Sequence, residues 1–475
     1  MLTYVLDASL QQPLYEQLSE AVKSDILAGH LKSGDKLPSK ISLADHLGVS
    51  KITVENAYAQ LLAEGYIYSR ERSGYYVEDI QVAGFSASLD ANPAFSGASA
   101  GVFIPEIPSE ASEENRSASS AAAELFPFSV WSRLMRGVIL DSGPDILAPG
   151  PGQGLRQLRE AIAKDLFKRR GMSVDPGQIF IGAGSEYFYN MLVQFFGRTR
   201  KYALENPGHR KIGFVYEAND AEIVPLKLDQ GGVIPGELEK SEAEIAHITP
   251  FNHFPTGAVM PIGRRQQIMS WLVAGENRYI IEDDYDSEFR FSGRPIPSMQ
   301  SMDTSGRIIY INTFSRTIAP AIRISYMILP AGLVEPWRTK MGFYNCTVPS
   351  FEQLTLTKFI EGGYFERHIN RLKKHYSGLL ESLKSVVLRP EFAEYCKIIN
   401  AGSGLNFILE FKDIPADSNL RSLLNLYLPQ ASLIEDYCIA PDARYDNCAV
   451  VDYTGLSPEK FGEGLALLVT TIYAK

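Results

Sequence analysis

Apolar residues recur at helical spacing near the start of the chain and divide it into three short segments. The apolar positions of the first segment lie within residues 14–26, and Gly29 is predicted to stop this helix. Ser39 and Ser50 precede the second and third segments, where each can cap a helix, and Gly48 supplies the tight turn between them. Two helices joined by a tight glycine-containing turn are typical of a helix-turn-helix.

A change to strand-like patterning follows Gly65. The aromatic and β-branched runs at 66–68 and 74–77 are separated by a short polar tip, which predicts a β-hairpin. A hairpin directly behind a recognition helix forms a wing, and Arg70 and Arg72 stand at its tip. The first part of the chain is therefore predicted to fold as a winged helix-turn-helix.

Short apolar runs alternate with helical patterns from residue 125 onward, after a segment (81–123) rich in Gly, Ser, Ala and Pro that we interpret as a flexible linker. This alternation predicts a mostly parallel α/β sheet that binds ligands at the carboxyl ends of its strands, followed by a smaller α+β region. We expect strands at 179–181, 212–216, 245–249, 279–282 and 308–313, and helices at 131–139, 155–170, 185–196, 262–273, 351–361 and 365–387.

Composition narrows the class of protein. The chain has 475 residues, 45% of them apolar and 21% charged, with a net charge of −10, which argues for several folded domains and against indiscriminate binding of nucleic acid. No signal peptide and no run of about 18 apolar residues is present, so we expect a cytoplasmic protein without a membrane span. The cysteines (Cys346, Cys396, Cys438 and Cys448) lack metal-ligand spacing, so no metal site is expected.

Polar side chains with a shared chemistry follow two of the expected strands. An acid and a phenol come after the first, and two hydroxyls and two guanidiniums come after the second. They are Asp283 and Tyr285, then Thr313, Ser315, Arg316 and Arg323. A third strand leads into the small-residue turn Ala183-Gly184-Ser185, whose backbone N–H groups can face a phosphate at a helix N-terminus. Together these groups suit an anionic, aromatic, phosphorylated ligand.

The first 80 residues resemble the winged helix-turn-helix of GntR-family transcription regulators over about residues 12–79. The landmarks Leu-Pro-Ser, Leu-Gly-Val-Ser, Thr-Val, Ala-Tyr and Glu-Gly-Tyr occur in the family's order. The resemblance implies binding to a DNA operator. It places the DNA-contacting residues at Lys40, Ser50, Lys51 and Thr53, with Arg70 and Arg72 of the wing on phosphates.

One departure from this pattern affects the expected affinity. Ile41 stands where the family usually has arginine, and residues 1–80 hold 7 Lys/Arg against 11 Asp/Glu. A phosphate contact is therefore missing, so binding to one half-site should be weak and sensitive to salt. A winged helix retained only for dimerisation or protein docking is the alternative.

The remainder of the chain resembles the fold-type I aminotransferase domain, in the form found behind a GntR head in MocR/GabR-type regulators. The resemblance rests on the segments IFIGAGS, ALENPGHR, TPFNHFPTGAVMP, YIIEDDYDSEFRF and YINTFSRTIAPAIRISYMILP. It implies a homodimer, a small-molecule effector (an amino acid or a compound related to pyridoxal 5'-phosphate) and this domain division: winged helix-turn-helix 10–80, linker 81–123, large aminotransferase-like domain 124–345, and small domain with connecting helices 346–475.

The resemblance also assigns positions around pyridoxal phosphate. Asp283 corresponds to the acid that pairs with the pyridinium nitrogen, Tyr285 to the phenol beside the ring hydroxyl, and His209 to the residue that stacks on the ring. The positions that correspond to phosphate ligands are Ala183, Gly184, Ser185, Thr313, Ser315 and Arg323.

Three positions depart from the aminotransferase pattern. Arg316 replaces the lysine that forms the Schiff base, and a guanidinium cannot act as an amine nucleophile near neutral pH. Val450 stands in the place of the arginine that binds the substrate carboxylate, and Lys211 replaces a second arginine common in the regulators. We therefore expect no catalytic residue, no transamination, and at most non-covalent binding of pyridoxal phosphate.

Simpler structural roles compete with several of these assignments. His209 could be a packing histidine, and Asp283 and Tyr285 could cap a strand. Arg316 could fill the cavity and pair with Asp283 or Asp286, with no ligand bound. The aromatic run Phe188, Tyr189, Phe195 and Phe196 is predicted to belong to the core, and no role is assigned to Asn252 and His253.

The interpretation that follows is a DNA-binding transcription regulator whose aminotransferase-like domain dimerises and senses a ligand. That ligand is pyridoxal phosphate, a preformed pyridoxyl–amino acid adduct or another phosphorylated anion; a pure dimerisation scaffold is also open. An active aminotransferase that uses a non-standard site is the alternative function. A protein-interaction module with a winged helix that does not bind DNA is the third.

Overall fold

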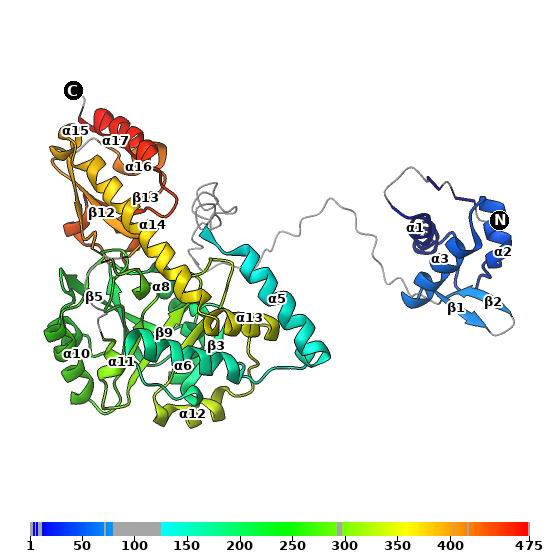
Figure 1. Ribbon diagram of the computed structural model, residues 1–475, viewed down its shortest axis with the longest axis horizontal. Helices are drawn as coiled ribbons and strands as arrows, with labels where there is room; N and C mark the ends of the chain where they lie inside the picture. Colours follow the sequence, from blue (N-terminus) through cyan, green and yellow to red (C-terminus); the bar gives the residue numbers. More distant parts are fainter. Residues whose placement is uncertain are drawn as a thin grey trace, which may run out of the picture. The chain divides into compact units, whose positions relative to one another are not determined.

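The computed structural model of the protein describes residues 3–4, 6–7, 12–70, 73–78, 125–291, 297–402, 404–415 and 418–473. The chain divides into two compact units, Met1–Ile104 and Pro105–Lys475 (Figure 1). The linker predicted at 81–123 lies outside the described residues. Within the described parts of the chain, no helix is both long and apolar enough to cross a membrane.

The N-terminal unit is the predicted winged helix-turn-helix. Its elements are α1 (Leu14–Leu27), α2 (Lys40–Leu47), α3 (Lys51–Ala63), β1 (Ile67–Arg70) and β2 (Gly74–Val77). Ser39 and Ser50 cap α2 and α3 as expected, each accepting a backbone N–H bond of 3.1 Å. Gly48 takes the left-handed conformation (φ 67°) that ends α2. The antiparallel hairpin β1–β2 pairs Ile67 with Val77, and both side chains are buried in the unit's core.

A mixed eight-stranded sheet forms the centre of the second unit. Its order is β3-β10-β9-β8-β7-β4-β5-β6, with β10 and β6 antiparallel to their neighbours and the rest parallel. The strands are β3 (Ile179–Gly182), β4 (Lys201–Asn206), β5 (Glu222–Asp229), β6 (Gly232–Val233), β7 (Ile245–Ile248), β8 (Tyr279–Asp283), β9 (Ile308–Thr313) and β10 (Ser325–Ile328).

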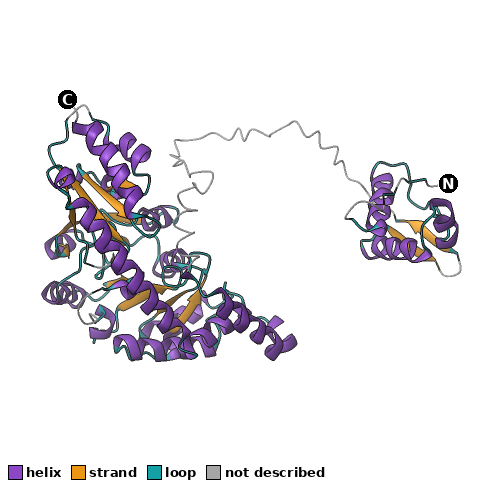
Figure 2. Cartoon of the chain, turned by 45° about the horizontal axis from the view of Figure 1, so that its top comes forward, coloured by secondary structure: helices purple, strands orange, loops and turns teal. Residues whose placement is uncertain are grey.

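Helices cover both faces of this sheet because its strands are apolar on both sides (Figure 2). In β9, Ile309 and Ile311 belong to the core beneath α7 (Ser185–Phe196), α8 (Arg210–Glu217) and α12 (Ala331–Met341). Ile308 and Tyr310 point to the opposite face. That face is covered by α5 (Phe128–Ser142), α6 (Arg156–Arg170), α9 (Pro235–Lys240), α10 (Ile262–Ala274), α11 (Met299–Met302) and α13 (Ser350–Glu361).

A four-stranded antiparallel sheet, in the order β11-β12-β14-β13, forms the second core of this unit. Its elements are β11 (Cys396–Ile399), β12 (Asn406–Phe411), β13 (Ala431–Leu433), β14 (Cys448–Asp452), α15 (Pro390–Ala393), α16 (Leu420–Tyr427) and α17 (Pro458–Tyr473). Helix α14 (Tyr364–Val387) joins the two cores, since Phe365 and Ile369 pack with the large sheet whereas Leu372 and Leu380 pack with the small one.

Short 3-10 helices complete the described elements. They are η1 (Gly143–Leu147), η2 (Pro176–Gln178), η3 (Ser287–Phe289), η4 (Ile434–Tyr437) and η5 (Ala443–Tyr445). Of these, η3 directly follows the end of β8 and so lies close in sequence to Asp283 and Tyr285.

The strand predicted at 212–216 is wrong, because these residues lie in helix α8. The run Ile-Gly-Phe-Val-Tyr is rich in strand-forming residues, but Gly213 and Tyr216 are buried at the i, i+3 spacing of one helix face. The strand in this region is β4, which the prediction missed because it ends on the polar pair Glu205 and Asn206. Both side chains are buried and hydrogen-bonded, so a strand of this kind does not look apolar in sequence.

Candidate functional site

A cavity of about 290 Å³ opens where β8 and β9 end, beside the N-terminus of α7. Seven of the nine residues predicted to contact the ligand line it together with Arg316: Ser185, His209, Asp283, Tyr285, Thr313, Ser315 and Arg323. Lys211, Glu186, Tyr189 and Asp452 are among its other lining residues. The carboxyl ends of neighbouring parallel strands thus bring the predicted groups to one place, as the topology requires.

Asp283 lines this cavity and has one carboxylate oxygen without a hydrogen-bond partner among the described residues. The residue ends β8 and is 3% exposed, and its Oδ2 accepts a hydrogen bond from the hydroxyl of Tyr189. The Nε2 atom of His247 lies 3.4 Å from the same oxygen. Oδ1 is buried and has no partner among the described residues. Since a buried carboxylate oxygen without a donor is costly, Asp283 suits a ligand that brings an N–H group.

Tyr189 corrects one prediction. Phe188, Phe195 and Phe196 pack in the hydrophobic core as expected, but Tyr189 also lines the cavity and bonds to Asp283. Helical spacing alone could not separate these residues, because a tyrosine on a buried face looks like any other core aromatic.

Hydroxyl groups and an arginine form the second corner of the cavity. The Ser315 hydroxyl donates to the backbone oxygen of Ile322 at 2.9 Å, and the Thr313 and Ser325 hydroxyl oxygens lie 2.8 Å apart. Arg323 closes this corner against the turn before α7. The turn needs glycine at position 184 for its φ of 92°, whereas a β-carbon there would meet only the flexible ends of Arg323 and Glu186.

Two of the predicted phosphate ligands do not line the cavity. Gly184 is not among the residues that line the cavity. Ala183 directs its backbone N–H to the hydroxyl of Thr347 at 2.9 Å. Of the turn residues, only Ser185 reaches the cavity wall.

Glu186 pairs with the cations of this corner, a contact that the sequence analysis missed. Its carboxylate pairs with Arg323 and, at 2.8 Å, with Lys211. Burial opposes its ionisation, but Lys211 and Arg323 outweigh burial and lower the pKa of Glu186 below its ordinary value. The signal was present in the sequence as an acidic residue directly after the small-residue turn.

Tyr285 and His209 approach the cavity from two loops. The Tyr285 hydroxyl donates to the backbone oxygen of Asn252 at 3.1 Å, and the Asn252 side chain donates to Asp286 at 2.5 Å. Asn252 therefore supports the loop that carries Tyr285. His209 directly precedes α8, and its ring lies 5.5 Å from the ring of Phe254.

Arg316 pairs with Asp452, and the pairing with Asp283 or Asp286 was wrong. Its Nη1 atom lies 3.6 Å from Asp452 Oδ2, while its Nε atom is buried and has no described partner. Burial disfavours the cation, but Asp452, with Tyr285 and Asp286, raises the pKa of Arg316 above its ordinary value. The cavity thus holds a charged guanidinium with an unused donor.

Asp452 belongs to the strand on which Val450 was singled out. Val450 packs with Ile408, Ile434 and Cys448 and does not line the cavity. The residue of β14 that does so is Asp452. This strand therefore contributes a carboxylate to the cavity wall, and it contributes no arginine.

The predicted DNA-contacting residues lie at the start of α2, at the start of α3 and on the hairpin. Lys51 is exposed and has no ion pair among the described residues. Lys40 pairs with Glu55 at 2.7 Å, and the hydroxyls of Ser50 and Thr53 lie 2.8 Å apart in the α3 cap. On the wing, Arg70 donates to the Tyr68 hydroxyl at 3.1 Å, whereas Arg72 lies outside the described residues.

No group of three or more His, Cys, Asp or Glu side chains is placed to hold a metal ion in the part of the chain that the structure describes.

Comparisons with known proteins match both units. The family of bacterial regulatory proteins, gntR family, matches residues 14–77. The uncharacterised HTH-type transcriptional regulator YdeL of Bacillus subtilis is 37% identical over 415 residues, covering 86% of each chain. The probable rhizopine catabolism regulatory protein MocR of Rhizobium meliloti is 29% identical over 479 residues, covering 99% of this chain and 96% of that protein.

Solved structures match the second unit in fold. The multiple substrate aminotransferase of Thermococcus profundus has a TM-score of 0.64 at 22% identity, covering 74% of this chain and 89% of that one. A gntR-type DNA-binding unit and an aminotransferase-like unit therefore lie in one polypeptide, and regulators related to it match along most of their length. The chain belongs to the MocR-type transcription regulators, which join a GntR-family winged helix-turn-helix to an aminotransferase-like domain.

Proposed function

We propose that this regulator binds pyridoxal phosphate without a covalent bond and uses the bound ligand to control its affinity for DNA. Ser185, Thr313, Ser315 and Arg323 would hold the phosphate, with charge-assisted bonds from the arginine. Asp283, Tyr285 and His209 would hold the ring, through its nitrogen, its hydroxyl and its face respectively. These assignments carry the ligand-binding roles implied by the family resemblance over to individual residues of this chain.

The free oxygen of Asp283 is the observation that supports a ring nitrogen at this position. Oδ2 is already engaged by Tyr189, whereas Oδ1 is buried without a donor. A protonated pyridine nitrogen would supply that donor and would be stabilised by the carboxylate charge. The fit of donor to acceptor favours a pyridoxal compound over a simple phosphate ester.

Arg316 is the reason to propose binding without turnover. Bound pyridoxal phosphate supplies an electron-accepting ring that stabilises carbanions, and aminotransferases use a lysine amine to hold it and to move protons. The Arg316 guanidinium stays charged near neutral pH, so it provides neither a nucleophile nor a base. Its guanidinium belongs to a residue that lines the cavity and would contact an anionic group of the ligand.

Exposed apolar side chains on the second unit support a homodimer. Leu140 of α5 is 74% exposed, Leu147 of η1 is 83% exposed and Phe343, after α12, is 76% exposed. Exposed apolar side chains mark an interface where they form one patch, and we propose that these three contribute to such a patch. A dimer would present two winged helices to two DNA half-sites, which offsets the weak affinity expected of each. Sedimentation velocity over a range of protein concentrations tests this part of the proposal.

The proposal is tested by titrating the purified full-length chain with pyridoxal phosphate and following thermal unfolding by tryptophan fluorescence. A ligand that binds the folded state raises the unfolding temperature. We expect such a rise, together with no gain of mass after treatment with borohydride, which would trap any imine between ligand and protein. A borohydride-dependent gain of mass would support the alternative of an active aminotransferase. No rise in unfolding temperature would favour a dimerisation scaffold.

A separate measurement addresses the DNA-binding unit. Footprinting on DNA upstream of the chain's own coding region at low salt should show protection over two half-sites. Absence of protection at low salt would favour the winged helix as a protein-docking module.

A further inference from the structure

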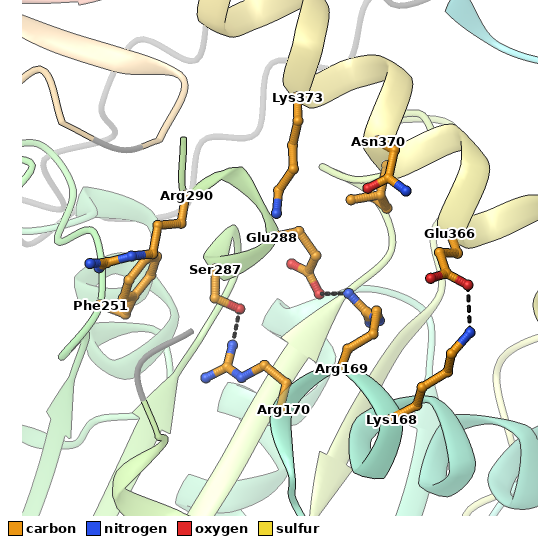
Figure 3. A pocket seen from close by; sticks show the side chains of 11 residues that line it. Lys168, Arg169, Arg170, Phe251, Ser287, Glu288, Arg290, Glu366, Asn370 and Lys373 are labelled. Carbon is orange, nitrogen blue, oxygen red and sulfur yellow. Dashed lines mark hydrogen bonds and ion pairs between the residues drawn. The ribbon is translucent and has the colours of Figure 1, made fainter. Parts of the chain in front are cut away.

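A second cavity lies beneath the loop that follows β8, and five cationic side chains line it (Figure 3). Its volume is about 300 Å³, and its walls come from the last turn of α6, from η3 with the residue that follows it, and from the first half of α14. Lys168, Arg169, Arg170, Arg290 and Lys373 are the cations. No residue lines both this cavity and the pocket proposed for pyridoxal phosphate.

Three of the five cations have partners. Lys168 pairs with Glu366 at 2.6 Å, and Arg169 pairs with Asp165 and, at 3.3 Å, with Glu288. Arg170 pairs with Asp284 at 2.7 Å and donates to the hydroxyl of Ser287. These contacts hold the walls in place and neutralise both carboxylates that line the cavity.

Lys373 and Arg290 remain without an ion pair among the described residues. The Lys373 side chain extends from α14 into the cavity above the Ser287–Glu288 turn, with Arg169 and Arg170 below it (Figure 3). Arg290 lies over the ring of Phe251, 6.0 Å from its centroid, and its Nε atom is buried without a partner. Arg170, whose side chain is only 10% exposed, also has a buried Nε without a partner.

Lys373 and Arg290 thus bring positive charge to the wall of a partly closed cavity without an ion pair among the described residues, and such charge is costly to hold unless an anion binds beside it. Burial lowers the pKa of Lys373, although Glu288 partly opposes this effect, so the ammonium gains from a further negative charge. A single group that carries close to two negative charges and several acceptor oxygens matches two cations and unused guanidinium donors. Phosphate has this charge and geometry, whereas the two charges of a dicarboxylate lie further apart.

We infer that this cavity is a second anion site, separate from the pyridoxal phosphate pocket, which binds a phosphoryl group through Lys373, Arg290 and Arg170. The phosphoryl group is either free inorganic phosphate or part of a small phosphate monoester. The cavity, at about 300 Å³, has room for either.

The test is a titration of the full-length chain with inorganic phosphate at constant ionic strength, maintained with chloride, followed by tryptophan fluorescence during thermal unfolding. We expect phosphate to raise the unfolding temperature, and we expect the Kd of Lys373→Gln to be weaker by about tenfold, as for loss of one charge-assisted contact. Lys374→Gln, the adjacent exposed lysine of α14 that does not line the cavity, should bind phosphate like the wild type.

Two further variants keep the result interpretable. Arg290→Gln should weaken binding in the same direction, which guards against a folding defect specific to Lys373→Gln. Arg323→Gln removes the arginine of the other pocket, and in that background the effect of Lys373→Gln should persist. This arrangement separates failure of the second site from failure of the pyridoxal phosphate pocket.

Titrations with glycerol 3-phosphate and with succinate, by the same thermal-unfolding measurement, identify the class of anion. Tighter binding of glycerol 3-phosphate than of phosphate would point to a phosphate monoester, and equal or weaker binding would point to free phosphate. Both results support a phosphoryl site. Tighter binding of succinate than of either, or equal binding of phosphate by Lys373→Gln and wild type, would overturn the inference.

Discussion

Arg316 is the residue on which the proposal of binding without turnover depends. Its guanidinium lies among the groups proposed to hold pyridoxal phosphate and pairs with Asp452 at 3.6 Å. Because that charge is permanent near neutral pH, the residue can contact a ligand but cannot attack it.

Replacing Arg316 with lysine should restore covalent attachment. An Arg316→Lys chain incubated with pyridoxal phosphate and reduced with borohydride should gain one pyridoxyl phosphate group, as measured by mass spectrometry of the intact protein. The wild type, whose pocket already contains Lys211, is the matched control and should gain none. If the variant also gains no mass with excess ligand, the pocket has lost its ability to bind the cofactor.

Glu186 should act as an internal competitor of the ligand's phosphate. The carboxylate pairs with both Arg323 and Lys211, so an incoming phosphate must replace it. We expect Glu186→Gln to bind pyridoxal phosphate about tenfold more tightly, since one like charge is removed from the anion corner. Affinity is measured by absorbance titration, with the exposed residue change Glu217→Gln as control. Weaker binding by Glu186→Gln would show that Glu186 helps to hold the ligand.

The sequence analysis identified the cavity residues that follow β8 and β9 better than the cavity residues that come from other elements. Asp283, Thr313 and Ser315 follow apolar runs with distinctive flanks, so their meeting at one sheet edge was predictable. Asp452 and Tyr189 were not, because they come from the small sheet and from a helix face. Which residue of a strand or helix meets a distant site depends on tertiary packing.

Among the elements, β4 carries a buried acid whose ionisation opposes folding. Glu205 is 7% exposed, accepts the backbone N–H of Thr249 at 2.9 Å and lies 3.4 Å from His253 Nε2. Burial raises the pKa of Glu205 to about 8, and burial lowers that of His253 to about 3. The histidine is therefore neutral and leaves the acid without a cation.

Stability of the second unit should fall as pH rises from 6.5 to 8. In this range the folded chain keeps on Glu205 a proton that the unfolded chain has lost, so this residue contributes a loss of up to about 1.4 kcal/mol per pH unit, which declines as pH approaches 8. Unfolded His253, with its ordinary pKa of 6.5, still loses part of its proton at the lower end of this range, which opposes the fall there, so the slope due to Glu205 is the difference between the wild type and Glu205→Gln.

Glu205→Gln should flatten this dependence by about the same slope. Urea unfolding followed by tryptophan fluorescence measures it, because all 3 tryptophans lie in the second unit. Glu239→Gln, an exposed change of the same type, should keep the slope of the wild type. Equal slopes for Glu205→Gln and wild type would contradict a protonated Glu205.

The recognition surface of α2 and α3 should gain affinity from one added charge. Ile41 is 59% exposed at the position where the family usually has arginine. Ile41→Arg should steepen the dependence of log affinity on log salt by about 0.9 per half-site, and Lys51→Ala should reduce it by about 0.9. The measurement is DNA binding at several salt concentrations, with Lys23→Ala on α1 as the matched loss of charge. An unchanged slope in both Ile41→Arg and Lys51→Ala would place the DNA elsewhere.

Elements with strong periodicity or clear caps were predictable from sequence. Both caps in the helix-turn-helix and the long helices α13 and α14 lie where the pattern placed them. The region around 201–217 was not, because α8 is rich in strand-forming residues and β4 ends on two buried polar side chains. Burial of hydrogen-bonded polar groups removes the apolar signal on which strand prediction depends.

For the whole molecule, two folds with different tasks share one chain. The gntR-type unit binds DNA, and the aminotransferase-like unit carries the cavity proposed for the ligand. Both architectures were predicted from motifs that occur in the family order. The structure and the comparisons confirm this predicted fold class. The pairing of these units matters only if ligand occupancy of one changes the DNA affinity of the other, which is a coupling free energy between two sites.

That coupling is measured directly by the Kd of the full-length chain for DNA upstream of its own coding region, determined by fluorescence anisotropy at one fixed salt concentration with and without saturating pyridoxal phosphate. The proposed function predicts a change of at least about fivefold, corresponding to about 1 kcal/mol, that is reversed when the ligand is dialysed away. An unchanged Kd at a ligand concentration that saturates the pocket would contradict the claim that this regulator senses pyridoxal phosphate.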